Sequence, residues 1–169
     1  MLNKICHRCF CYFYSCDNKP GWRKCACGVY RMENEIIKLD DYITANGKYP
    51  ERLQSVELTQ EVKDDAVKLL NKINQLLKEL GIKEAKVSSG FRPSSVNSKI
   101  PNAAKKSLHM SGQACDINDP DGKLDKLFDE NDVLLKKYGL WQEHPDDTKG
   151  WAHLDCKDRG KRKKNQFKP

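Results

Sequence analysis

Histidine and aspartate are the residues of this chain whose types and spacing could do chemistry. Only four histidines occur among its 169 residues. His109 lies a few residues before Asp116, and His153 follows in a later apolar segment. A catalytic zinc site needs three nitrogen or oxygen ligands from the protein and a fourth position that is open to water. These are the residue types that such a site needs, provided that the fold brings them together.

Two short segments are predicted to be strands that carry these residues on a polar face. Successive side chains of a strand point to opposite faces of a sheet. In residues 151–156, this alternation places His153 and Asp155 on one face and apolar side chains on the other. In residues 113–118, it places Asp116 on a polar face in the same way. Each polar face is therefore free to line a cleft while the opposite face is buried.

Apolar residues at helical spacing predict one main core helix, which begins after Thr59 and ends at Gly81. The elements expected after it are a strand over 86–89, a loop over 90–97, a strand over 113–118, a turn over 119–122, a helix over 124–137, and strands over 140–143 and 151–157. The last two strands are expected to form a hairpin across the loop 144–150. The predicted class is α+β, with a small antiparallel sheet packed against helices.

Three motifs carry a resemblance to a known family. Residues 107–116 read SLHMSGQACD, which fits the pattern S-x-H-x-x-G-x-A-x-D. SGFRP precedes it at 89–93, with Asn97 behind, and WAHLD follows at 151–155. In these motifs and their order the chain resembles zinc D-alanyl-D-alanine carboxypeptidases and related phage endolysin L-alanyl-D-glutamate peptidases. The resemblance implies a Hedgehog/D,D-peptidase-like fold.

The resemblance also implies a role for particular residues. It implies that His109, Asp116 and His153 bind one catalytic zinc ion, and that Arg92 binds a substrate carboxylate or the oxyanion formed during attack. A planar guanidinium suits this role because it holds a carboxylate by two parallel hydrogen bonds and stabilises developing negative charge.

Two further residues are predicted to orient the ligands. Asp155 lies two residues after His153 and is the candidate partner for an imidazole. Ser107, at the start of the first motif, is expected to play a similar part.

The general base is the point at which the sequence departs from the family pattern. Many relatives place Glu or Asp three residues before the last histidine, where this chain has Gly150. We predict Glu143 instead, because a hairpin would return it beside His153. The rival candidates are His144, Asp146 and Asp147.

The composition restricts the class of protein and its partners. The chain carries a net charge of +7, and 33% of its residues are charged. No stretch approaches the roughly 18 to 20 apolar residues of a membrane span, and residues 1–16 do not read as a signal peptide. The tail 157–169 contains the basic run 161–164. It is interpreted either as a solvated end or as a segment that holds anionic wall polymer. We expect a monomer.

Six of the eight cysteines lie within the first 27 residues. Residues 1–31 therefore form a predicted cysteine-rich segment, and residues 32–169 the zinc peptidase domain. Cys6, Cys9, Cys25 and Cys27 are candidate ligands of a structural zinc ion. The alternative is a leader or an over-extended gene start, because Met32 could itself begin the protein.

Together these features predict a zinc peptidase that hydrolyses the stem peptide of peptidoglycan, as a D,D-carboxypeptidase or an L-alanyl-D-glutamate endopeptidase. We expect synthesis in the cytoplasm, for example of a phage-infected host, and action on the wall after release. The alternative is a zinc-containing wall-binding module with weak or no catalysis. Nucleic-acid binding by the cysteine segment and basic tail ranks last, because it gives the three core motifs no purpose.

Overall fold

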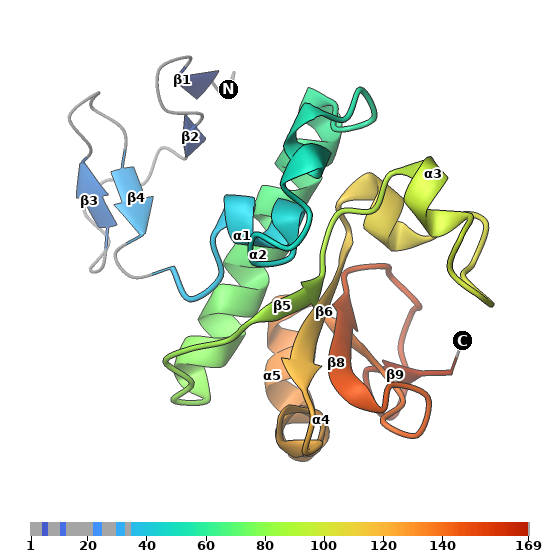
Figure 1. The fold of residues 1–169 in the computed structure, drawn as a ribbon. Helices are drawn as coiled ribbons and strands as arrows, with labels where there is room; N and C mark the ends of the chain where they lie inside the picture. The colour runs from blue at the N-terminus through green and yellow to red at the C-terminus, as the bar shows by residue number, and fades with distance from the viewer. Residues whose placement is uncertain (1–4, 7–10, 13–21, 25–29, 33–34, 169) are drawn as a thin grey trace. The chain divides into compact units, whose positions relative to one another are not determined.

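The computed structural model describes residues 5–6, 11–12, 22–24, 30–32 and 35–168 (Figure 1). The chain divides into two compact units, Met1–Glu35 and Ile36–Pro169. In the first unit, β1 (Ile5–Cys6) pairs antiparallel with β2 (Cys11–Tyr12). There β3 (Trp22–Lys24) pairs in the same way with β4 (Tyr30–Met32).

The predicted cysteine zinc site falls in this first unit. Cys9, Cys25 and Cys27 lie outside the described residues, and so does the side chain of Cys6. Both the site and the predicted boundary before Met32 therefore stay predictions.

Helix α2 (Gln60–Glu79) is the main core element of the second unit, as the apolar spacing predicted. The backbone N–H of Val62 donates to the Thr59 hydroxyl at 3.3 Å, which caps the start of the helix. One face is buried along the whole helix, through Ala66, Leu69, Leu70, Ile73, Leu76 and Leu77. These side chains belong to one apolar core together with Ile117, Ala152 and Leu154 of the sheet. The helix therefore supports the sheet from one side (Figure 1).

The five-stranded sheet has the order β5-β6-β8-β7-β9. Its strands are β5 (Val87–Ser89), β6 (Ala114–Asp119), β7 (Trp141–Glu143), β8 (Gly150–Asp155) and β9 (Gln166–Phe167). Pairing is antiparallel among the first four, which includes the predicted β7–β8 hairpin. The α+β class is confirmed, but the sheet is mixed because β9 joins β7 in parallel. The sequence did not predict β9, since a short strand after a run of lysines carries no local signal.

The remaining elements are short and lie around this helix and sheet. They are α1 (Leu39–Thr44), η1 (Pro50–Gln54), α3 (Ser94–Asn97), η2 (Leu108–Ser111), α4 (Lys123–Glu130) and α5 (Asp132–Tyr138). Two predictions need correction. The expected loop 90–97 contains α3, and the expected helix 124–137 is two helices. Asn131 separates them, and its side chain donates to the Leu127 carbonyl at 2.8 Å, a side-chain bond that competes with continued helix.

The two faces of the central strands differ as alternation predicts. Cys115, Ile117, Ala152 and Leu154 are fully buried on the helix side. The opposite face carries the acidic and imidazole side chains. None of the helices in the described part of the chain combines the length and apolar character needed to cross a membrane.

Candidate metal centre

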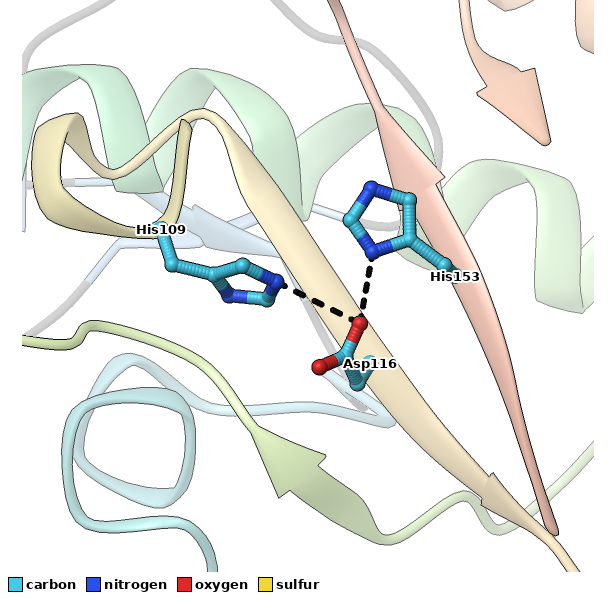
Figure 2. A group of neighbouring side chains, drawn as sticks. All are labelled: His109, Asp116 and His153. Carbon is cyan, nitrogen blue, oxygen red and sulfur yellow. Dashed lines mark hydrogen bonds and ion pairs between the residues drawn. The ribbon is translucent and has the colours of Figure 1, made fainter. Parts of the chain in front are cut away.

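The centre forms where β6 and β8 run side by side. Their register sets Asp116 directly opposite His153, and His109 reaches the same point from η2 (Figure 2). Nδ1 of His153 lies 2.6 Å from Oδ1 of Asp116, and Nε2 of His109 lies 3.3 Å from the same oxygen. One candidate ligand atom from each of the three residues lies within 4.8 Å of the others. The structure therefore brings the three predicted ligands together.

His109 is held in a defined orientation. Its side chain is 2% exposed, and Nδ1 lies 2.8 Å from the carbonyl oxygen of Gly90. A carbonyl only accepts, so Nδ1 carries a proton, and Nε2 is the nitrogen that faces Asp116. The backbone N–H of Arg92 donates to the carbonyl of His109 at 3.1 Å, which ties η2 to the loop after β5. This is the arrangement of an imidazole ligand oriented through its second nitrogen.

Asp155 faces His153 from its other side. Nε2 of His153 lies 3.6 Å from Oδ2 of Asp155, while Nδ1 faces Asp116. Asp155 is only 1% exposed, although it lies on the polar face of the strand. The structure thus places Asp155 beside an imidazole, where its proposed orienting role requires it.

The charges at the centre suit a cation. Burial by itself raises the pKa of the Asp116 carboxyl, but the two histidines outweigh it, so that the pKa lies far below the usual range. Burial lowers the pKa of His109 and favours its neutral form. Burial also opposes the charging of His153, yet the hydrogen bond to Asp116 and the nearby carboxylate of Asp155 raise its pKa to about 9. Without a metal, a proton on His153 therefore balances the buried carboxylate.

The three donors fit zinc. Two imidazole nitrogens and one carboxylate oxygen form a three-ligand set of the kind found in catalytic zinc sites. The Asp116 oxygen lies between the two imidazoles (Figure 2). A single cation held beside this oxygen would meet all three donors. A dication there would replace the proton of His153 as the partner of the carboxylate.

Arg92 lies beside these residues and is half-buried. Burial lowers its pKa, and the charges of Asp116 and Glu143 act in the opposite direction. Nη2 donates to the Ser107 hydroxyl at 3.1 Å, whereas the buried Nε has no hydrogen-bond partner among the described residues. Ser107 therefore contacts Arg92. The orienting role predicted for Ser107 would act on this guanidinium and not on a candidate metal ligand.

Glu143 lies at the edge of the centre, at the end of β7. Oε2 is 3.9 Å from Nδ1 of His153. Burial raises the pKa of this carboxyl, the charge of His153 lowers it, and the charge of Asp116 raises it, with a net increase. Among the rival bases, His144 and Asp146 contact each other at 3.4 Å, and Asp147 is exposed. Of these four residues, Glu143 is the one whose side chain contacts the three-residue centre, through His153.

Sequence reasoning missed two residues that contact this site. Arg159 pairs with Asp155, and the ring of Phe167 meets the ring of His153 edge-on, with centroids 5.9 Å apart. Both lie in the tail, which the sequence predicted to be either a solvated end or a segment that holds wall polymer. No local pattern marks them, because each acts on a residue brought close only by the folded sheet.

An α+β fold with three candidate ligands of the His-Asp-His type points to the class of zinc-dependent hydrolases. The sequence model of the Peptidase M15 family matches residues 45–142. This is more than half of the chain, and the protein therefore belongs to the M15 peptidases, a zinc-dependent family that includes D-Ala-D-Ala carboxypeptidases. Neither the curated proteins nor the solved structures gave a significant match. The matched stretch ends just before Glu143 and does not reach His153, so the family match does not bear on either residue.

Proposed function

We propose that this protein is a zinc peptidase that hydrolyses a peptide bond in the stem peptide of peptidoglycan. The observation that carries the proposal is the convergence of His109, Asp116 and His153 within 4.8 Å in a chain of the M15 family. A zinc ion held by these residues supplies Lewis acidity, which activates water and polarises a carbonyl group.

Glu143 is the proposed general base. It accepts a proton from the attacking water and returns it to the leaving amine. Its Oε2 lies 3.9 Å from Nδ1 of the candidate ligand His153, a separation that supports this role because a water bound in the centre would lie close to the carboxylate. Its raised pKa, caused first by burial, favours a carboxylate that can both take up and release a proton. This placement is our reason for preferring a peptidase to a wall-binding module without catalysis.

Arg92 is the proposed substrate-binding residue. Its Nη2 is held by Ser107, and its buried Nε is left without a partner among the described residues. A guanidinium in this state gains by binding an anion through parallel hydrogen bonds. Stem peptides offer carboxylates next to the bonds cut by both activities, at the terminal D-alanine and at D-glutamate. Arg92 therefore supports either specificity, and the products must distinguish them.

We further propose that the enzyme works as a monomer with one zinc ion at this centre and acts on the wall after release from the cell. The exposed residues Lys161, Arg162 and Lys163 are proposed to hold anionic wall polymer. Lys164, from the same basic run, instead pairs with Asp129 at 2.5 Å.

The test uses the full-length chain. Zinc content is measured by elemental analysis, and mass spectrometry identifies the fragments released from purified peptidoglycan. Free D-alanine would indicate a carboxypeptidase, and a new amino terminus on D-glutamate an endopeptidase. We expect His153→Ala to lose both zinc and activity. Glu143→Gln should keep zinc but lose roughly a hundredfold or more in rate, whereas Glu84→Gln, at an exposed position, should change neither.

Two results would go against the proposal. A folded wild-type chain that holds no zinc would refute it. Stoichiometric zinc together with wall binding, but without cleavage of either bond, would favour the binding module.

A further inference from the structure

The C-terminal segment 157–167 lies against the metal centre instead of extending into solvent. Arg159 makes two parallel hydrogen bonds to Asp155, from Nη1 to Oδ1 at 2.6 Å and from Nη2 to Oδ2 at 2.7 Å. The backbone N–H of Lys157 donates to Oδ1 at 3.0 Å. Asp155 is 1% exposed, and a carboxylate buried to this degree needs a paired and hydrogen-bonded countercharge. Arg159 supplies it.

The contact continues from Asp155 to a ligand residue. Oδ2 of Asp155 faces Nε2 of His153 at 3.6 Å, and Nδ1 of the same ring faces Asp116. Arg159, Asp155, His153 and Asp116 therefore form a continuous series of contacts. In such a series, the partner of the outer imidazole nitrogen determines how the ring presents its inner nitrogen to a metal.

Phe167 packs against two members of this series, Arg159 and His153. The guanidinium carbon of Arg159 lies 3.6 Å from the centroid of the Phe167 ring, and that ring packs edge-on against His153. Phe167 is also the cross-strand partner of Glu143, and its carbonyl accepts from the backbone N–H of His144 at 2.8 Å. One aromatic residue thus contacts the stacked arginine, a candidate ligand and the strand of the candidate base.

The segment is fastened to the domain independently of these contacts. The side chain of Asn165 donates to the carbonyl of Leu140 at 3.0 Å, and its backbone N–H donates to Asp132 at 2.6 Å. Loss of the Arg159 side chain would therefore leave β9 attached, while Asp155 loses its two guanidinium bonds.

We propose that Arg159 is a positioning residue of the metal centre, which fixes Asp155 and, through it, the ring of His153, with Phe167 holding the guanidinium in place. This inference rests on the proposed function, because it assumes that His153 binds zinc. It assigns to the basic tail a role inside the enzyme that is separate from any contact with the wall.

The test compares full-length variants that remove charge at two positions of the tail. Arg159→Gln removes the guanidinium, Arg159→Lys keeps the charge without two parallel bonds, and Lys168→Gln removes an exposed charge of the same tail as the matched control. Zinc affinity is measured by competition with a chromophoric chelator. The absorption spectrum of the cobalt(II)-substituted protein reports the ligand geometry, and thermal unfolding of the metal-free protein reports stability.

We expect the zinc dissociation constant to rise about tenfold or more in Arg159→Gln, with a smaller rise in Arg159→Lys and no change in Lys168→Gln. The cobalt spectrum should shift in the two Arg159 variants only. Wild-type zinc affinity and an unaltered cobalt spectrum in either Arg159 variant would overturn the inference, even if that variant were less stable. A wild-type chain that binds no zinc would refute the proposed function itself. A chain that binds zinc without cleaving peptidoglycan would leave the positioning role testable.

Discussion

Gly112 joins the first motif to the strand that carries Asp116, and replacing it with alanine tests how the centre is supported. It follows η2 with φ +75°, a backbone conformation that L side chains rarely adopt. A Cβ atom at this position would lie 2.4 Å from the carbonyl oxygen of Val62 and 3.0 Å from the backbone nitrogen of Ala66. Both are backbone atoms of α2 and cannot rotate away. The glycine is therefore required for close packing between η2 and the core helix.

Two costs add in Gly112→Ala. Placing a residue with a Cβ in the left-handed region costs roughly 1 to 2 kcal/mol. Overpacking against a well-packed element costs roughly 1 to 3 kcal/mol more. Gly122 is the matched control, since its φ is +68° and a Cβ there meets nothing within 4 Å. We therefore expect Gly112→Ala to lose roughly 3 kcal/mol of unfolding free energy, and Gly122→Ala only roughly 1 kcal/mol.

Urea unfolding of the metal-free proteins measures both losses, and chelator competition measures zinc affinity. Relief of the clash must move η2 away from α2, and His109 moves with it, so zinc affinity should fall in Gly112→Ala but not in Gly122→Ala. Equal destabilisation by the two substitutions would refute the claim that close packing at Gly112 supports the site. Reduced stability with undiminished zinc affinity would show that η2 can shift without displacing His109.

Three further perturbations test the site and its surroundings. Arg92→Lys should keep zinc but lower kcat/KM on stem peptides by roughly tenfold to a hundredfold, because an ammonium cannot make two parallel bonds to a carboxylate; unchanged kinetics would remove Arg92 from substrate binding. The side chain of Asn74 accepts from the backbone N–H of Ile37 and donates to the carbonyl of Ile37, both at 2.9 Å. Asn74→Ala should therefore lower the unfolding free energy measured in urea by roughly 2 kcal/mol, and Asn71→Ala on the same helix should lower it much less. Burial lowers the pKa of His153, but the neighbouring carboxylates raise it to about 9, so the metal-free protein binds this proton more tightly than the unfolded chain. The bound proton therefore stabilises the metal-free protein by on the order of 3 kcal/mol. This stabilisation is fully present below about pH 6.5 and is lost as the pH rises through about 9. Equal unfolding free energies at the two ends of this range would contradict it.

The sequence by itself determined the features that depend on local periodicity. The 3.6-residue spacing of leucines predicted α2, because an apolar stripe must face a core. Strand alternation predicted that Asp116 and His153 lie on polar faces, because successive side chains of a strand point in opposite directions. The three motifs and their order indicated the family, which the match to the M15 peptidases confirmed.

Only the tertiary structure decided which side chains meet. The β6–β8 register sets Asp116 against His153 across 37 positions of sequence, and the parallel strand β9 brings Phe167 to both His153 and Glu143. Ser107 contacts Arg92, and Arg159 neutralises Asp155 from a tail that the sequence predicted to be solvated or bound to wall polymer. The sequence carries no periodic pattern that predicts such contacts, because they depend on how whole elements pack and not on the residues next to them in the chain.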